Sequence, residues 1–167
     1  MSLEAETRIA HSVDEVIRAY SSRDFHDHLA SRFGATLLSF EVSGDTSGEF
    51  TITSEQTMPV DKLPDIARKV IRGDVRVTVT DRWAAPAADG ARSSEMTVKL
   101  GSAPVSAAAT QALKPEGESA TVSTVHGEVN TSIPLIGKKL KAAAEPYLAK
   151  FVDRQAREVS AWLAENS

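Results

Sequence analysis

The chain has 167 residues, with 19 basic and 23 acidic side chains and a formal net charge of −4. This balance argues against a nucleic-acid-binding protein, which normally carries a clear basic excess or a basic stripe. The chain contains no cysteine, which excludes a disulfide framework, a thiolate nucleophile and a cysteine metal site. Its first residues show no signal-peptide pattern, and no apolar run approaches the roughly 18 residues of a membrane span. We therefore expect a soluble cytoplasmic protein without integral membrane association, forming one domain over residues 1–167.

The N-terminal part of the chain predicts a strand followed by two short helices. Apolar and charged residues alternate over residues 3–9, which is the period of a strand. Ser12 precedes Glu15 by three residues, the spacing of a capping box, so a helix is expected to begin there. A second helix is expected over residues 22–33. Helices this short need a surface to pack on.

Six sequential strands are expected in the middle of the chain, because the apolar period changes to two. Short turns separate them, so they must form an antiparallel meander. One helical insertion is expected at residues 64–71. A bulge is expected near Ser123, since Val122 is out of phase with Val125 and Val129. The predicted strands cover residues 36–42, 50–56, 75–83, 94–100, 105–113 and 120–131.

The last third of the chain predicts one long amphipathic helix from Pro134 to Leu163. Its apolar residues recur at spacings of three, four and seven, which gathers them on one face. A helix of about 30 residues is on the order of 45 Å long, and it would cover one face of the meander while the other stays wet. Pro146 lies inside this helix and cannot bond to the carbonyl of Ala142. A kink is therefore expected between Ala142 and Pro146.

The predicted order resembles the α+β helix-grip fold of the START-like superfamily. In that fold, a curved antiparallel sheet of about seven strands wraps around a long C-terminal helix, with two short helices after the first strand. The chain also resembles, more closely, an actinobacterial family catalogued as domain of unknown function 2505. The resemblance implies a cavity between sheet and helix, but no reaction. The segments that carry it are Leu63-Pro64, Asp81-Arg82-Trp83, Gly101-Ser102-Ala103-Pro104-Val105 and Ile133-Pro134-Leu135-Ile136-Gly137.

Three polar residues of the predicted sheet are candidates for chemistry in such a cavity. His126 and Glu128 share one face of the last strand. On the covered face they would form an acid/base pair; on the wet face they would be solvated, which is the interpretation we favour. Asp81 lies between Val79 and Trp83 on the apolar side of its strand, where desolvation would raise its pKa. The alternative, which we favour, is that the strand ends or bulges there and Asp81 reaches water or pairs with an arginine.

No pattern in the sequence indicates a catalytic nucleophile, a metal site or a cofactor. The Gly-x-Ser-x-Gly motif is missing. His26 and His28 are two residues apart, so a helix turns them about 200° from each other. The glycine-rich residues 44–48 contain no lysine and join two strands, which favours a hairpin turn over a phosphate loop. We expect no catalytic residue set, no bound metal and no cofactor.

The predicted fold places apolar residues of sheet and helix opposite one another. A sheltered apolar pocket with a few polar groups is the usual form of a small-molecule site. Our first hypothesis is a binding or carrier domain for a hydrophobic small molecule, such as a lipid, a sterol-like or a polyketide-like compound. The alternatives are a cyclase- or hydrolase-like enzyme on the same fold, and a structural or partner-binding domain with no cavity. The ligand and the oligomeric state stay open. The predicted ligand-binding residues are Phe40, Phe50, Met58, Trp83, Met96, Tyr147, Phe151 and Gln155.

Overall fold

The computed structural model describes residues 3–59, 61, 65–68, 75–101, 105–131 and 137–166. The side chains of Leu3, Ala67, Tyr147, Leu148 and Asn166 lie outside that description.

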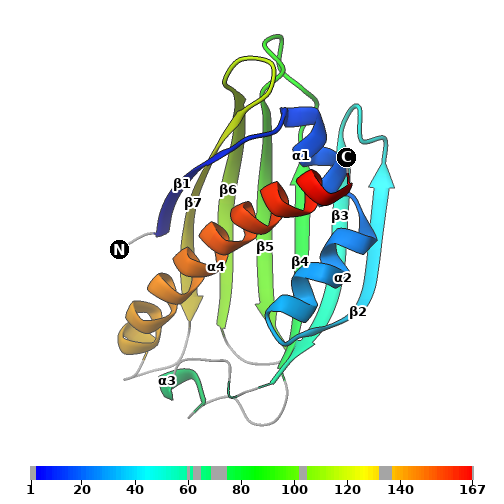
Figure 1. The fold of residues 1–167 in the computed structure, drawn as a ribbon. Helices are drawn as coiled ribbons and strands as arrows, with labels where there is room; N and C mark the ends of the chain where they lie inside the picture. The colour runs from blue at the N-terminus through cyan, green and yellow to red at the C-terminus, as the bar shows by residue number, and fades with distance from the viewer. Residues whose placement is uncertain are drawn as a thin grey trace.

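Seven antiparallel strands form one curved sheet (Figure 1). The spatial order is β1-β7-β6-β5-β4-β3-β2, so β2 to β7 form the predicted meander and β1 joins it beside β7. The two edges of the sheet are β1 and β2. The strands are β1 (Leu3–Ile9), β2 (Thr36–Gly44), β3 (Phe50–Met58), β4 (Val75–Trp83), β5 (Arg92–Leu100), β6 (Val105–Pro115) and β7 (Thr121–Thr131).

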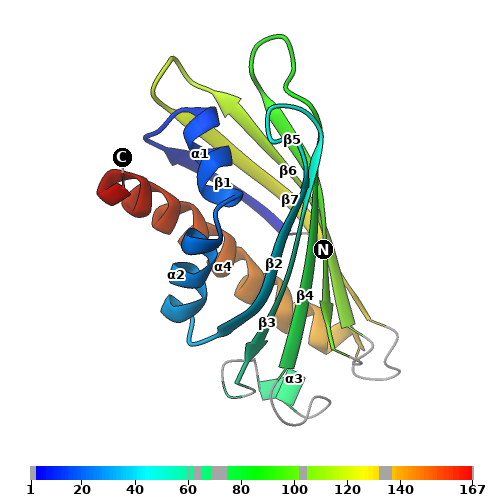
Figure 2. The ribbon, with the colours of Figure 1, turned by 90° about the vertical axis from the view of Figure 1, so that its right-hand side faces the viewer.

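The helices α1, α2 and α4 lie on one side of this sheet (Figure 2). The bounds are α1 (Val13–Tyr20), α2 (Arg23–Arg32), α3 (Asp65–Arg68) and α4 (Gly137–Asn166). The long helix α4 crosses the sheet obliquely and contacts β1 and β7, as well as α1 and α2 (Figure 1). The predicted α+β fold, a curved sheet around a long C-terminal helix with two short helices after the first strand, is confirmed.

The start of α1 follows the predicted capping box. The Ser12 hydroxyl accepts from the backbone N–H of Glu15 at 3.2 Å, and the Glu15 carboxylate accepts from the backbone N–H of Ser12 at 3.3 Å. Both groups satisfy donors that the first turn would otherwise leave free. Residues 134–136 of the predicted last helix, and residues 64 and 69–71 of the predicted insertion, lie outside the described residues. The helix α4 continues through Pro146 without a break in its assignment, and the kink there stays a prediction.

The bulge predicted near Ser123 is wrong. Over the described strands, β7 pairs with both β1 and β6 without a shift of register. The inward row of β7 contains the buried polar residues Thr121 and Ser123, and Val122 faces outward. A register shift occurs instead in β2, between Leu37 and Ser39.

The buried apolar residues form two separate clusters among the described residues. The larger, here called the α1 cluster, joins α1, α2 and the end of α4 to one end of the sheet, and includes Phe25, Trp83 and Leu163. The smaller, called the α3 cluster, lies at the other end of the strands. It comprises Met58, Val75, Val77, Val105, Val129 and Leu140, with Ile66 of α3 packed against it.

Candidate functional site

The inner face of the sheet, which faces α4, is not covered evenly. Directly paired residues of antiparallel strands point to the same face, so Ile52, Asp81, Met96, Ala109 and Gly127 form one inward row across β3 to β7. Most inward residues at both ends of the central strands are buried, as apolar members of the two clusters or as the polar residues Arg92, Ser94 and Gln111. Those in the middle of the strands are only half-buried. We call these half-buried residues the central floor: Ser54, Gln56, Val79, Met96, Val98, Ala107 and Ala109.

The central floor is mostly apolar, with Ser54 and Gln56 of β3 as its polar members. Val79 and Val98 contact the α3 cluster, and the row that contains Met96 adjoins the row of Trp83 in the α1 cluster. Ala107 and Ala109 of β6 add little volume. Gly127 suits this close packing, because a Cβ there would lie 3.0 Å from the Ala109 Cβ and β6 would have to shift slightly. The floor is thus a shallow, mostly apolar surface between two packed ends.

Asp81 borders the floor on the side of the α1 cluster, directly opposite Met96 of β5. The residue is 8% exposed, and its Oδ1 atom has no hydrogen-bond partner among the described residues. Burial raises the pKa of the Asp81 carboxyl to about 6, and the neighbouring Ser94 and Trp83 side chains oppose part of this rise. The favoured interpretation, that the strand ends or bulges and frees Asp81, is wrong: β4 pairs regularly through this position with β3 and β5. No arginine of the described chain forms an ion pair with it.

Two further polar atoms beside Asp81 are also buried without a partner within the described ranges. They are Nε1 of Trp83, a donor, and Oγ of Ser94, a hydroxyl that both donates and accepts. Trp83 and Ser94 are paired across β4 and β5, one inward position further from the floor than Asp81. Buried polar groups nearly always have partners. Ser94 and Trp83 lie near enough to lower the Asp81 pKa as hydrogen-bond donors, yet none of the three atoms makes a hydrogen bond of good geometry within the described ranges. A water molecule or a polar ligand group would complete their hydrogen bonds.

Tyr20 of α1 packs against these three polar residues on the side away from the floor. Its hydroxyl accepts from the Gln111 amide at 3.4 Å, and its ring stacks on Trp83 with 6.0 Å between centroids. Burial, together with the nearby Asp81 charge, raises the pKa of the Tyr20 phenol to about 12. Tyr20 therefore stays protonated at neutral pH. The Trp83 ring stacks in turn on Phe50, at 6.1 Å, so three aromatic layers lie beside the carboxyl.

Sequence reasoning missed Tyr20, Ser94 and Gln111. The alternation of β5 places Ser94 on the face of Met96, a signal that was available. The inward position of Gln111 is likewise implied by its alternation with Leu113. The pairing of Gln111 with Tyr20 joins residues 91 positions apart, and no local pattern reveals such a contact.

The structure distributes the predicted ligand-binding residues over several regions. Met96 lies in the central floor, Phe50 and Trp83 are buried in the α1 cluster, and Met58 is buried in the α3 cluster. Three of the others are half-buried: Phe40, Phe151 and Gln155. The ring centroids of Phe40 and His26 are 4.7 Å apart, and those of Phe151 and Phe33 are 4.6 Å apart. Gln155 has no hydrogen-bond partner in the described chain. The Tyr147 side chain lies outside the described residues. Their contact with a ligand stays a prediction.

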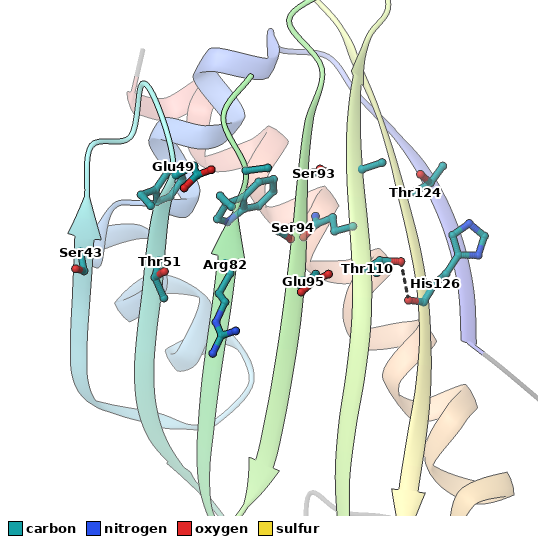
Figure 3. A pocket seen from close by; sticks show the side chains of 15 residues that line it. Ser43, Glu49, Thr51, Arg82, Ser93, Ser94, Glu95, Thr110, Thr124 and His126 are labelled. Atoms are coloured by element: carbon teal, nitrogen blue, oxygen red, sulfur yellow. Dashed lines mark hydrogen bonds between the residues drawn. The ribbon is translucent and has the colours of Figure 1, made fainter. Parts of the chain in front are cut away.

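His126 and Glu128 are exposed on the outer face, as the solvated interpretation predicted. The His126 Nδ1 atom lies 3.1 Å from a carboxylate oxygen of Glu4 on β1. His126 also borders a hollow of about 650 Å³ on the outer face, together with Arg82, Glu95 and Thr110 (Figure 3). Polar outward residues of the strands line much of this hollow, and α4 lies on the opposite side of the sheet (Figure 3). The lining also includes the buried residues Phe50, Trp83, Ser94 and Gln111. It is not the predicted cavity between sheet and helix, which stays a prediction.

Within the described ranges, no three side chains of the types that bind metals gather into a candidate site. None of the helices that the structure describes is long and apolar enough to cross a membrane.

Comparison with solved structures identifies the fold. A protein from Thermus thermophilus matches with a TM-score of 0.63 and 14% identity, over 100% of this chain and 99% of that chain. The Zhui aromatase/cyclase from a Streptomyces species matches with a TM-score of 0.62 and 10% identity, over 98% and 93%. A START superfamily protein from Mycobacterium smegmatis matches with a TM-score of 0.58 and 10% identity, over 99% of each chain. At such identities the likeness shows the fold, which is the START-like helix-grip fold.

The particular family follows from the sequence. The chain belongs to the family described as a protein of unknown function, DUF2505, whose model matches residues 4–163. No curated protein matches the chain.

Proposed function

We propose that residues 1–167 form one cytoplasmic domain that binds or carries a hydrophobic small molecule between the sheet and α4. The observation that carries the proposal is the central floor. Its residues face the side of the sheet that α4 occupies, yet they remain half-buried between two fully buried clusters. Half-buried apolar surface in a sheltered position is what a small apolar ligand covers. A lipid, a sterol-like or a polyketide-like compound fits this description.

The aromatic and apolar residues around the floor supply the walls of the proposed site. Met96 belongs to the floor, and Phe50 and Trp83 lie on its α1 side while Met58 lies on its α3 side. From the helical side, Phe151 and Gln155 are half-buried on α4. We include Phe40 and Tyr147 as wall residues on the basis of the sequence alone. The Streptomyces neighbour is an aromatase/cyclase, which agrees with an aromatic or polyketide-like occupant.

A pair of variants on β6 tests this proposal. Ala107 faces the floor, and the adjacent Ala108 is exposed on the outer face. The Ala107→Phe variant should fill the floor and weaken the binding of a naphthalene probe by at least about tenfold, which corresponds to about 1.4 kcal/mol. The Ala108→Phe variant adds the same ring on the wet face and should bind as the wild type does.

Binding is measured by fluorescence titration, with circular dichroism to show that both variants are folded. Native mass spectrometry of the purified wild type complements it, because a carrier is expected to retain a small molecule. Equal probe affinity in the wild type and the Ala107→Phe variant would count against a ligand at the floor. In that case the closed structural or partner-binding domain would be favoured.

A second candidate function is an acid/base enzyme of the cyclase or hydrolase type, and Asp81 is the observation that favours it. Burial raises the pKa of its carboxyl to about 6, close to the pH at which a general acid or base works best. Such an enzyme would lose turnover in an Asp81→Asn variant that still binds the probe. Unchanged turnover of a converted substrate in that variant excludes Asp81 as the catalytic residue.

A further inference from the structure

The unsatisfied groups beside the floor have a definite hydrogen-bonding composition. Oδ1 of Asp81 is an acceptor, the Trp83 indole N–H is a donor, and the Ser94 hydroxyl donates when an acceptor is offered. All three belong to residues at most 8% exposed. A group that satisfies them all must donate one hydrogen bond and accept two.

A hydroxyl group has this composition, with one donor and two acceptor lone pairs. An ammonium group only donates, so it would leave the Trp83 N–H facing another donor. A ketone oxygen only accepts, so it would leave the Asp81 oxygen unsatisfied. A carboxylate would place a second negative charge beside a buried carboxyl, which is unfavourable at short range.

We propose that the bound molecule presents an uncharged hydroxyl group to Asp81, Trp83 and Ser94. This inference rests on the proposed function, and it adds the class of ligand: an apolar, preferably aromatic, alcohol or phenol. The stacked rings of Tyr20, Trp83 and Phe50 lie on the same side of the floor, and flat aromatic ligands pack well against such layers.

The path to this anchor runs past Asp81. Of the three residues it keeps the largest exposure, 8% against 2% for Trp83 and 4% for Ser94. It also lies one inward position nearer the floor than the other two. The three atoms are closed to solvent in the structure, so the Asp81 side chain has to shift to admit the hydroxyl group and then accepts its hydrogen bond.

The test compares three probes that share one ring system: 2-naphthol, 2-methylnaphthalene and 2-naphthoate. The wild type should bind 2-naphthol at least about fivefold more tightly than 2-methylnaphthalene, because the hydroxyl group makes buried hydrogen bonds that the methyl group cannot make. It should bind 2-naphthoate more weakly than 2-naphthol. Isothermal titration calorimetry at neutral pH gives the three dissociation constants.

Variants of the anchor then locate the hydroxyl group. Asp81→Leu should reduce the preference for 2-naphthol over 2-methylnaphthalene to about onefold, and Ser94→Ala should reduce it about threefold. Ser93→Ala is the matched control, because Ser93 is exposed on the outer face directly beside Ser94 in the chain. It should leave the preference unchanged. If Asp81→Leu does not fold, the comparison of Ser94→Ala with Ser93→Ala decides.

The outcomes separate this inference from the function on which it rests. Equal wild-type affinity for 2-naphthol and 2-methylnaphthalene would overturn the hydroxyl anchor, leave the hydrophobic site standing and assign the buried groups to a water molecule. A preference that survives both Asp81→Leu and Ser94→Ala would also overturn it, because the hydroxyl group would then sit elsewhere. Failure to bind any of the three probes would overturn the proposed function together with the anchor.

Discussion

Asp81 holds a carboxyl group in a place where its charge is costly. The residue is 8% exposed and has no cationic partner among the described residues. An aspartate has a pKa of 3.8 without its surroundings, and burial raises the value for Asp81 to about 6. The native protein therefore binds more protons than the unfolded chain between these two pH values. Ionisation of Asp81 lowers stability as the pH rises through this window, and the loss is complete above it.

Removal of this charge should stabilise the protein at neutral pH. A shift of about two pKa units corresponds to about 3 kcal/mol, so the Asp81→Asn variant should gain up to that free energy of unfolding at pH 7. At pH 4, where the native wild-type carboxyl is protonated, the two proteins should be equally stable. Urea denaturation at both pH values measures the difference. A variant less stable than the wild type at pH 7 would show that the carboxylate has a stabilising partner.

The sequence predicted the position of Asp81 but not its environment. Alternation along β4 placed it correctly on the apolar side, between Val79 and Trp83. The polar groups around it come from β5, β6 and α1. Which of their residues lie beside Asp81 depends on the strand register and on the placement of α1, and the sequence of the turns does not determine these. The prediction that Asp81 reaches water was wrong because β4 continues to Trp83 without a bulge.

At the scale of single elements, a local sequence pattern predicted the structure correctly where the hydrogen bonds involved join residues close together in the chain. The capping box at Ser12 and Glu15 is an example, since both hydrogen bonds lie within four residues. The last strand is the opposite case. Its inward row accepts Thr121 because the hydroxyl donates to the carbonyl of His11 at 2.7 Å. A buried polar residue with a distant partner looks like an outward residue in the sequence, which produced the false bulge.

The β2–β3 hairpin also depends on a distant residue. Arg92 of β5 donates to the carbonyls of Thr46 and Gly48 at 3.1 and 2.9 Å, and its guanidinium lies over the Phe50 ring. The sequence predicted the turn from its glycines but contained no sign of this anchor. The arginine ties the edge hairpin to the centre of the sheet, beside the α1 side of the proposed site.

For the whole molecule, the order of elements and the meander followed from the sequence, because six sequential strands with short turns allow few other arrangements. The division of the core into two clusters did not. It depends on how far α4 reaches over the central strands, and the described contacts place α4 chiefly over β1 and β7. A hydrophobic stripe predicts that a helix packs on a sheet, but not which strands it covers.

The two clusters have a consequence for how the protein unfolds. With the floor between them only half-buried, the two apolar clusters are separate in the empty protein, and only the shared strands join them. A ligand on the floor would touch both ends and make the loss of one depend on the loss of the other. Calorimetry should then show a broad transition for the empty protein and a narrower, more cooperative one at saturating 2-naphthol. Transitions of equal width would mean that the two ends already unfold as one unit in the empty protein, and that the ligand does not change the cooperativity of unfolding.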